Sequence, residues 1–391
     1  MNNVESTCCW RCNSEKLIRR GKQFNAKKTV WKQVWVCKNC GLKFADKTLH
    51  LVDYEEEKFI YQDKEVRTTD WTQYNHRKQE EKENFLAFAT ELLDQFEFKQ
   101  LRTGGRPATK TRDLLLGMLV KIYAKKPSRD TISELKLLKK LGYVEQVPCY
   151  VTLLNCFANP SFQPILEKML ELSSLPFRGI ENTMSIDGSG LGVSKYTRWF
   201  DEKYGEPKEK RMYRKIHLMI GTRSLVITSA SVTAQEGQNS SDTSQFPELL
   251  RKTAINFNLN SICADMGYLS GKNFDLAESI GADLYIPFKK NSKGRGNGSA
   301  WKKMYHLFQN EPQTFLRKYH ERSMSETAFS TIKSKFNSYL LTKNYQSNVN
   351  EALTMCIAHN LCRLNAIHSE MNLETTSLTE AQKGQKIAIK L

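Results

Sequence analysis

Two aspartates stand where open α/β proteins carry their chemistry. Asp187 ends the short apolar segment 183–187 and is followed by Gly-Ser-Gly, which leaves room for a ligand beside the carboxylate. Asp265 ends the segment 261–265 in the same way and is followed by Met-Gly-Tyr. Ligands of open α/β sheets bind at the carboxyl ends of strands. An aspartate at a strand end is also a common turn former, so one such residue is weak evidence for a catalytic site. Two aspartates in the same sequence context are stronger evidence for it.

A third carboxylate belongs to a polar set further along the chain. The set consists of Tyr319, Arg322, Glu326 and Lys333. In one continuous helix all of them fall on a single narrow stripe. A carboxylate flanked by two cations and a phenol suits a phosphodiester held by metal ions. A structural interpretation stays open, because Ser323 and Glu326 have the spacing of a capping box.

The three acidic residues favour hard cations. Asp and Glu side chains without a nearby His or Cys select Mg²⁺ or Mn²⁺ rather than zinc. Two such ions about 4 Å apart promote in-line phosphoryl transfer, because one activates the attacking oxygen and the other stabilises the leaving oxygen. The pattern therefore predicts cutting or joining of DNA.

Four cysteines form two C-x-x-C pairs at the N-terminus, Cys9 with Cys12 and Cys37 with Cys40. Each pair supplies half of a tetrahedral Zn²⁺ shell, and the alternatives are free thiols or a redox pair. A redox C-x-x-C would be single and would lie beside a βαβ pattern, so we predict structural zinc. Neighbouring Cys8 leaves the register of the first pair open.

The segment between the cysteine pairs is basic and aromatic. Trp31 and Trp35 lie there among many Lys and Arg residues, a mixture that suits contact with phosphates and bases. A solvated basic surface is the alternative.

The charge balance points to a polyanionic partner. Among 391 residues, Lys and Arg number 59 against 42 Asp and Glu, and the net charge is +17 at pH 7. Such an excess favours nucleic acid over an acidic small molecule. An anionic membrane surface is the competing explanation, but no segment resembles a basic amphipathic helix or a membrane span. The N-terminus lacks the features of a secretory signal, so we expect reduced cysteines.

Secondary-structure patterns divide the chain into a helical part and a mixed part. Helices are predicted at 80–98, 109–124, 131–141, 150–157 and 162–173. Strands are predicted at 183–188, 215–221, 225–233, 261–265 and 283–288, with helices at 246–257, 271–279, 326–339 and 349–367 and a basic loop at 291–300. The order predicts a mixed sheet covered on both faces.

The predicted organisation has five parts. They are a zinc ribbon at 1–46, a linker at 47–78, a helical DNA-engaging region at 79–178, an α/β catalytic domain at 179–368 and a polar tail at 369–391.

Several weaker signals have ordinary explanations. His217 reads as part of the polar face of a strand, and Asp242 reads as a helix cap. Gly104-Gly105-Arg106-Pro107 is either a hook for the minor groove or a plain helix start. The helices at 131–141 and 150–157 form either a helix-turn-helix that reads DNA or simple packing.

Together these motifs resemble the DDE transposases of prokaryotic insertion sequences. The resemblance covers about residues 182–365 and rests on four segments. They are Ile186-Asp187-Gly188-Ser189, Ala264-Asp265-Met266-Gly267-Tyr268, Leu284–Asn291 and the Tyr319-x2-Arg322-x3-Glu326-x6-Lys333 spacing. The last segment matches the family's Y-R-E-K signature at every interval.

The resemblance implies a fold and a mechanism. The fold is an α/β RNase H-like core with a mixed five-stranded sheet, preceded by a mainly helical region and a zinc ribbon. Asp187, Asp265 and Glu326 would hold two Mg²⁺ or Mn²⁺ ions. Tyr319, Arg322 and Lys333 would contact phosphates at the transposon ends.

The resemblance also implies the partners and the setting. These are double-stranded DNA at the transposon ends and the target, a homodimer or larger assembly on those ends, no membrane, and the cytoplasm of a prokaryote in association with the nucleoid. The short interval from Asp265 to Glu326 leaves little room for a large inserted domain, which argues against a hairpin route that needs one. The alternatives are a domesticated, non-enzymatic DNA-binding protein and a metal-dependent nuclease without strand transfer.

Overall fold

The computed structural model describes residues 9, 12, 14–25, 30–41, 43–45, 70–99, 108–193, 213–234, 241–295, 298–370 and 387–390. The chain divides into two compact units, Met1–Thr68 and Thr69–Leu391.

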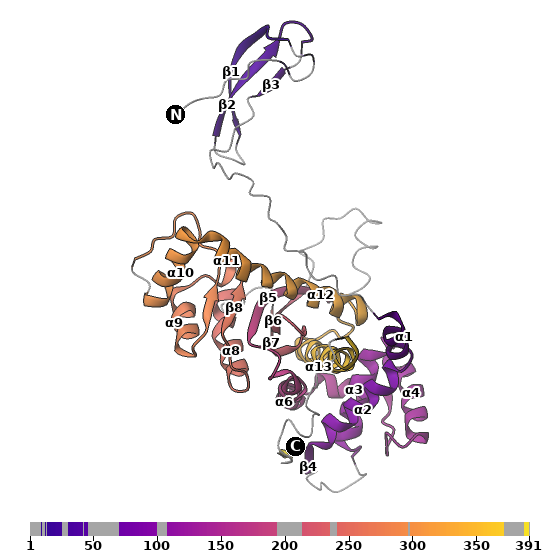
Figure 1. Ribbon diagram of the computed structural model, residues 1–391. Coiled ribbons are helices and arrows are strands. Elements are labelled where there is room, and N and C mark those ends of the chain that lie inside the picture. Colours follow the sequence, from indigo (N-terminus) through magenta and orange to yellow (C-terminus); the bar gives the residue numbers. More distant parts are fainter. Residues whose placement is uncertain are drawn as a thin grey trace. The chain divides into compact units, whose positions relative to one another are not determined.

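The N-terminal unit contains a small antiparallel sheet. Its strands are β1 (Leu17–Asn25), β2 (Val30–Cys37) and β3 (Lys43–Ala45), paired in that order (Figure 1). Their register places the second cysteine pair at the end of β2.

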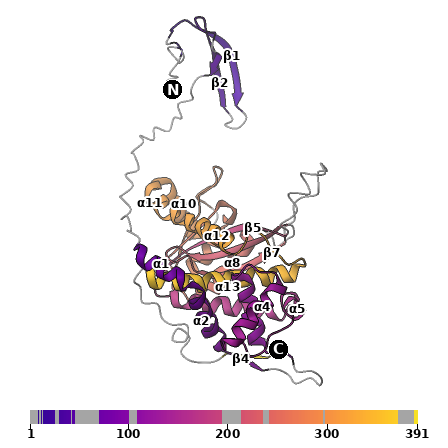
Figure 2. The same ribbon diagram turned by 90° about the vertical axis from the view of Figure 1, so that its right-hand side faces the viewer.

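The second unit begins with helices that share one hydrophobic core. They are α1 (Trp71–Gln79), α2 (Glu81–Asp94), α3 (Thr111–Tyr123), α4 (Ser128–Lys140), α5 (Tyr150–Ala158) and α6 (Phe162–Ser174), followed by the 3₁₀ turn η1 (Leu175–Phe177). The long helix α13 (Tyr345–Glu370) packs across α2, α3, α5 and α6, as Figure 2 shows. Because of this packing, the helical region and the last helix stabilise each other.

The end of the second helix differs from the prediction. The helix predicted over 80–98 ends at Asp94, and β4 (Phe96–Lys99) follows it. This strand pairs in parallel with β10 (Ile387–Lys390), so part of the predicted polar tail is a strand. Residues 46–69, 100–107 and 371–386 lie outside the described part of the chain, and with them most of the predicted linker, the Gly-Gly-Arg-Pro segment and most of the tail.

A mixed five-stranded sheet forms the centre of the second unit. It consists of β5 (Thr183–Gly192), β6 (Tyr213–Gly221), β7 (Ile227–Thr233), β8 (Ser261–Ala264) and β9 (Asp283–Tyr285). The spatial order is β7-β6-β5-β8-β9. The β5–β6 and β6–β7 pairs are antiparallel, whereas β5–β8 and β8–β9 are parallel. The predicted RNase H-like α/β fold is thereby confirmed.

Helices cover both faces of the sheet because side chains alternate along its strands. Ile186 and Met219 face α8 (Asp242–Ala254) and α9 (Gly271–Ser279), in one hydrophobic cluster. Ile216 and Leu218 face the other way and join a second cluster with α6, α13 and α12 (Ser323–Lys335). In Figure 1, α12 lies along β5 and β6.

Two helices were absent from the sequence prediction. They are α10 (Gly298–Asn310) and α11 (Pro312–Tyr319), so the predicted basic loop gives way to a helix at Gly298, and residues 296–297 are not described. A third helix, α1, also differs from the prediction, because it occupies the end of the predicted linker at 47–78. Trp301 and Phe315 anchor α10 and α11 in an aromatic cluster with Phe288. Pro312 occupies the first turn of α11, where its missing N–H is not needed.

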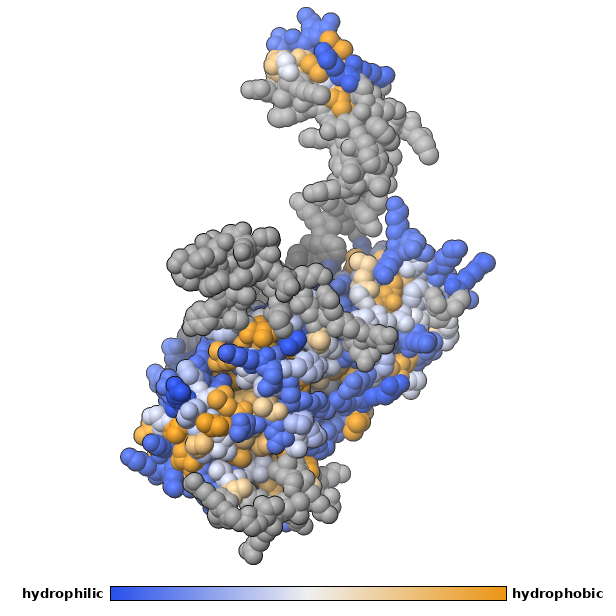
Figure 3. Space-filling model, turned by 180° about the vertical axis from the view of Figure 1, so that it is seen from behind, coloured by the Kyte–Doolittle hydropathy of each residue, from blue (hydrophilic) through white to orange (hydrophobic). Residues whose placement is uncertain are grey.

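One face of the molecule is mostly polar where its residues are described. Figure 3 shows hydrophilic side chains over most of the coloured surface, with smaller hydrophobic patches between them. Among the described residues, every helix is too short or too polar to span a bilayer.

Candidate active site

Neighbouring strands bring Asp187 and Asp265 side by side, but the prediction that Asp187 ends its strand is wrong. Asp187 lies inside β5, which continues to Gly192 because its antiparallel pairing with β6 extends beyond its parallel ladder with β8, whereas Asp265 directly follows β8. In the parallel β5–β8 ladder, Ile186 pairs with Ala264, and the next residue on each strand is an aspartate. Adjacent strands lie about 4.8 Å apart, and equivalent residues on them point to the same face. The two aspartates therefore share one face, the face opposite that of Ile186.

The chain from α11 to α12 crosses this face. The single continuous helix assumed for residues 319–333 is interrupted, because the 3₁₀ turn η3 (His320–Arg322) lies between α11 and α12. The hydroxyl of Ser185 on β5 donates to the backbone carbonyl of Arg322 at 3.3 Å and ties this turn to the strand. Arg322 and Lys333 both contact β5 despite the break.

Arg322 joins two of the predicted catalytic carboxylates. Its Nη1 donates to Asp187 Oδ2 at 3.2 Å, and its Nη2 donates to Glu326 Oε1 at 2.6 Å. Burial alone would lower the pKa of Arg322, but the hydrogen bond to Glu326 and the nearby charges raise it. Asp265 is exposed, and among the described residues no hydrogen bond links it to Asp187 or Glu326.

Asp187 is the most enclosed of the three carboxylates. Its side chain is 18% exposed and accepts the Gly188 N–H at 2.8 Å and the Ser325 hydroxyl at 3.1 Å. Burial raises the pKa of Asp187, although the Gly188 N–H, Arg322 and Ser325 all favour its charged form. The sequence analysis did not identify Ser325 as a site residue. Its position directly before Glu326 is the one feature of the sequence that could have indicated this role.

Glu326 does not serve as a helix cap. The Ser323 hydroxyl donates to the His320 carbonyl at 2.9 Å, and α12 has no side-chain cap. The Glu326 side chain is 62% exposed and pairs with Arg322. The capping-box interpretation is therefore wrong, and this carboxylate is open to a ligand on its solvent side.

Lys333 and Tyr319 flank the carboxylates. Lys333 Nζ donates to Ser189 Oγ at 2.7 Å, and burial lowers its pKa. The Arg322 guanidinium lies 5.9 Å from the centre of the Tyr319 ring. Burial raises the pKa of Tyr319, so its hydroxyl stays protonated and can donate a hydrogen bond.

The predicted cap role of Asp242 is wrong. The N-cap of α8 is Ser241, whose side chain accepts the Ser244 N–H. Asp242 instead pairs with Lys215, and its Oδ1 lies 3.4 Å from His217 Nδ1. His217 is fully buried rather than part of a solvated strand face. No local signal distinguishes these roles, because the contacts come from separate elements.

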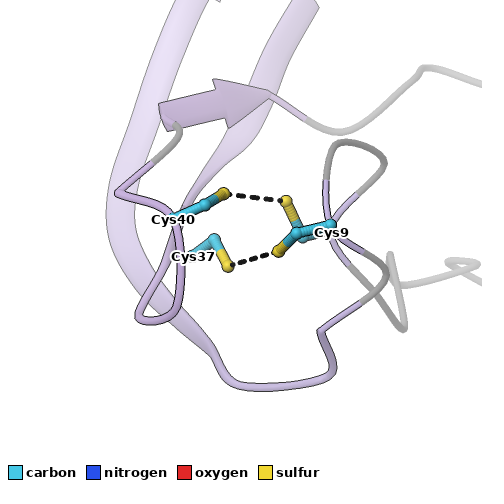
Figure 4. Close-up of side chains that lie close together, drawn as sticks. Cys9, Cys37 and Cys40 are labelled. Carbon is cyan, nitrogen blue, oxygen red and sulfur yellow. Dashed lines mark hydrogen bonds between the residues drawn. The ribbon is translucent and has the colours of Figure 1, made fainter.

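The four predicted zinc ligands meet in the N-terminal unit. In Figure 4 the Cys9 sulfur faces Cys40 at 3.6 Å, and Cys12 Sγ lies 3.5 Å from Cys37 Sγ. All four sulfurs lie within 4.8 Å of one another. A tetrahedron with zinc–sulfur bonds of 2.3 Å has edges of about 3.8 Å, so the group fits Zn²⁺.

Electrostatics around Cys37 also suit a metal ligand. Hydrogen bonding to the Cys40 backbone, aided by the Asn39 backbone and the neighbouring thiols, lowers the pKa of Cys37 to about 6. The thiolate is the form that binds metal. Trp35 is buried beneath Arg19, whose guanidinium lies 5.1 Å from the ring, so it is not available for stacking on a base. Cys8 and the side chain of Trp31 lie outside the described residues.

The fold and the site together define an α/β domain with one aspartate inside the central strand β5, a second directly after the neighbouring strand β8, and a glutamate on a covering helix. Residues 179–361 match the family model of the transposase DDE domain. This part of the chain is therefore similar to transposase DDE domains.

The chain is also similar to a solved structure. It is a cryo-EM structure of the piggyBac transposase synaptic complex with hairpin DNA, which shares 12% identity over 78% of this chain and 76% of that chain with a TM-score of 0.35.

Proposed function

We propose that this protein is the transposase of a prokaryotic insertion sequence. It binds double-stranded DNA at the transposon ends, cleaves it by water attack and joins the 3′-OH ends to target DNA. The observation that supports this most is the meeting of Asp187 and Glu326 on one guanidinium, beside the strand end that carries Asp265, within a domain similar to transposase DDE domains.

The residues fit the divalent cations that this chemistry uses. The Arg322 guanidinium lies between Asp187 and Glu326, so a positive charge is accommodated between these carboxylates. Their oxygens, with those of Asp265, form the donor set that Mg²⁺ or Mn²⁺ prefers. Two such ions, when bound, supply Lewis-acid stabilisation of the attacking and leaving oxygens.

The side chains of the site have distinct tasks in this proposal. Ser325 and the Gly188 N–H hold Asp187 in one orientation, so that its charge is directed toward the face that α12 covers. Lys333 and Arg322 contact phosphates at the transposon end, and Tyr319 donates a hydrogen bond to the DNA backbone. Ser189 keeps the long Lys333 side chain against β5, which lowers the entropy lost on binding.

The remaining parts of the chain serve DNA engagement. The N-terminal cysteine unit at 1–46 holds one structural Zn²⁺, and the helical region at 79–178 contacts DNA. We place the catalytic domain at 179–368. The protein works in the cytoplasm near the nucleoid and acts on paired DNA ends as a homodimer or a larger assembly.

The proposal is tested by cleavage and joining assays on DNA that carries the sequences flanking the gene. Asp187→Ala, Asp265→Ala and Glu326→Ala should each abolish Mg²⁺-dependent cleavage while DNA binding survives, because the charge removed is negative. Asp283→Ala is the matched control, because Asp283 belongs to the same sheet but pairs with Lys303.

Three results would contradict parts of the proposal. Retained cleavage by Asp187→Ala would overturn the assignment as an enzyme. Full cleavage by Glu326→Ala would remove that residue from the catalytic set. Cleavage by the parent protein without any joining to target DNA would indicate a nuclease.

A further inference from the structure

A buried polar cluster lies on the face of β5 opposite Asp187. It consists of Lys215 and His217 on β6, Asp242 at the start of α8, and Tyr268 in the 3₁₀ turn η2 (Met266–Tyr268). Asp242 Oδ1 lies 2.5 Å from Lys215 Nζ and 3.4 Å from His217 Nδ1. His217 Nδ1 is also 3.2 Å from the Tyr268 hydroxyl. Four residues from three elements thus form one connected network.

The cluster touches the backbone next to Asp187. Gly188 pairs with His217 across the β5–β6 ladder. A methyl group at Gly188 would lie 3.0 Å from Lys215 Cε, 3.1 Å from His217 Nδ1 and 3.4 Å from Asp242 Oδ1. The cluster therefore packs directly against the strand residue that follows Asp187.

The same cluster holds the backbone next to Asp265. A methyl group at Gly267 would lie 2.7 Å from Asp242 Oδ2. The neighbouring Thr243 hydroxyl donates to the Gly267 carbonyl at 2.8 Å. Asp242 thus lies between the two segments that carry the aspartates, and it contacts each of them where glycine leaves room.

The burial of the cluster shows that it is not a solvated charge pair. His217 and Tyr268 are 0% and 1% exposed, and the side chains of Lys215 and Asp242 are each 27% exposed. Thr233 Oγ1 lies 3.4 Å from the other ring nitrogen of His217, and the buried residues of α8 and α9 pack around the network. A polar network in such a place is costly unless every member is satisfied, and when satisfied it fixes a single geometry.

We propose that Asp242, held by Lys215 and His217, is a positioning residue for the acidic site. It fixes the spacing of the β5 segment after Asp187 and the η2 turn after Asp265, and so sets how tightly their carboxylates bind a divalent cation. The inference rests on the proposed function, because it concerns the cation of that same site.

The test is Mn²⁺ binding by the full chain, measured by electron paramagnetic resonance, alongside thermal unfolding. Residues that orient metal ligands change metal affinity by about 10- to 100-fold when replaced. Asp242→Asn should therefore weaken Mn²⁺ binding about ten-fold or more. Lys215→Met is the second variant, and it should weaken binding in the same direction if Asp242→Asn fails to fold.

The matched control is Glu167→Gln. Glu167 pairs with Lys252 at 3.0 Å, near the other end of the same helix α8, and the two side chains are comparably exposed. Loss of this ion pair should leave the Mn²⁺ affinity unchanged. A purely structural role for Asp242 would lower the unfolding temperature in the same way as Glu167→Gln and would leave the Mn²⁺ affinity of the folded protein intact.

Two glycine substitutions on β5 test the positioning role independently of Asp242. Gly188→Ala should weaken Mn²⁺ binding, because the new methyl group meets the buried His217 ring. Gly190→Ala on the same strand should not, since its methyl group meets only the Tyr213 side chain, at 3.4 Å or more.

The outcomes separate the two proposals. Parental Mn²⁺ affinity in both Asp242→Asn and Lys215→Met overturns the positioning role while leaving the proposed function intact. Asp187→Asn serves as the reference for loss of the site. If the parent binds no Mn²⁺, or binds it no better than Asp187→Asn does, the proposed function fails, and the positioning role fails with it.

Discussion

Replacing Arg322 by alanine removes the guanidinium that donates to both Asp187 and Glu326. A hydrogen bond between charged groups contributes about 1.5–3 kcal/mol when it is shielded from water, and the contact to Asp187, which is 18% exposed, belongs to this class. The contact to Glu326, which is 62% exposed, resembles a surface ion pair and contributes about 0–1 kcal/mol. We therefore expect the variant to lose about 1.5–4 kcal/mol of unfolding free energy at neutral pH.

The pH dependence of this loss follows from the charge on Asp187. Burial already raises the pKa of Asp187, and removing Arg322 raises it further because a favourable charge is lost. The stabilisation by Arg322 is present while Asp187 is ionised and disappears as the pH falls through the pKa of Asp187. The difference between parent and variant should therefore narrow in acid.

The assay is urea unfolding of both proteins at neutral and at acid pH. Lys318→Ala is the control, because Lys318 forms a neighbouring surface pair with Glu321 at 3.3 Å, with side chains 44% and 34% exposed. This control should lose less than about 1 kcal/mol. The reasoning is refuted if Arg322→Ala costs no more than Lys318→Ala, or if its cost is the same at both pH values.

Three further predictions concern other parts of the molecule. The full chain purified under reducing conditions should carry about one Zn²⁺, and Cys37→Ser should lose it; less than about half an equivalent in the parent, measured by elemental analysis, would contradict the zinc assignment. Lys333→Ala should weaken binding to DNA ends and reduce its salt slope by about one, and an unchanged slope would show that Lys333 contacts no phosphate. Burial lowers the pKa of Lys121, whose Nζ has no hydrogen-bond partner within the described chain. The folded state therefore binds this proton less tightly than the unfolded chain, and stability should rise with pH up to about 10.4, a rise that Lys121→Met flattens in urea unfolding.

Local patterns identified the features whose signals lie close together in the sequence. The strands next to Asp187 and Asp265 follow from short apolar runs ending in an acid and small residues, although β5 continues past Asp187 to Gly192. The parallel ladder then places the two aspartates side by side. The cysteine pairs were recognised from their spacing, and their sulfurs converge. The contact between Arg322 and Glu326 also follows from local spacing, because Arg322 is the N-cap of α12 and lies four residues before Glu326.

Contacts between segments that are distant in the sequence could not be predicted from the sequence alone. The β4–β10 pairing joins residues near 97 and 389. Because the two strands are far apart in the sequence, no local pattern predicts that they pair. The Asp242 carboxylate follows a serine at the start of α8 and so resembles a helix cap, yet Lys215 and His217 approach it from another element. A helix cap depends on the backbone within a few residues of it, so its pattern can be recognised in the sequence. An ion pair depends on which elements the core brings together, and only the tertiary structure decides that.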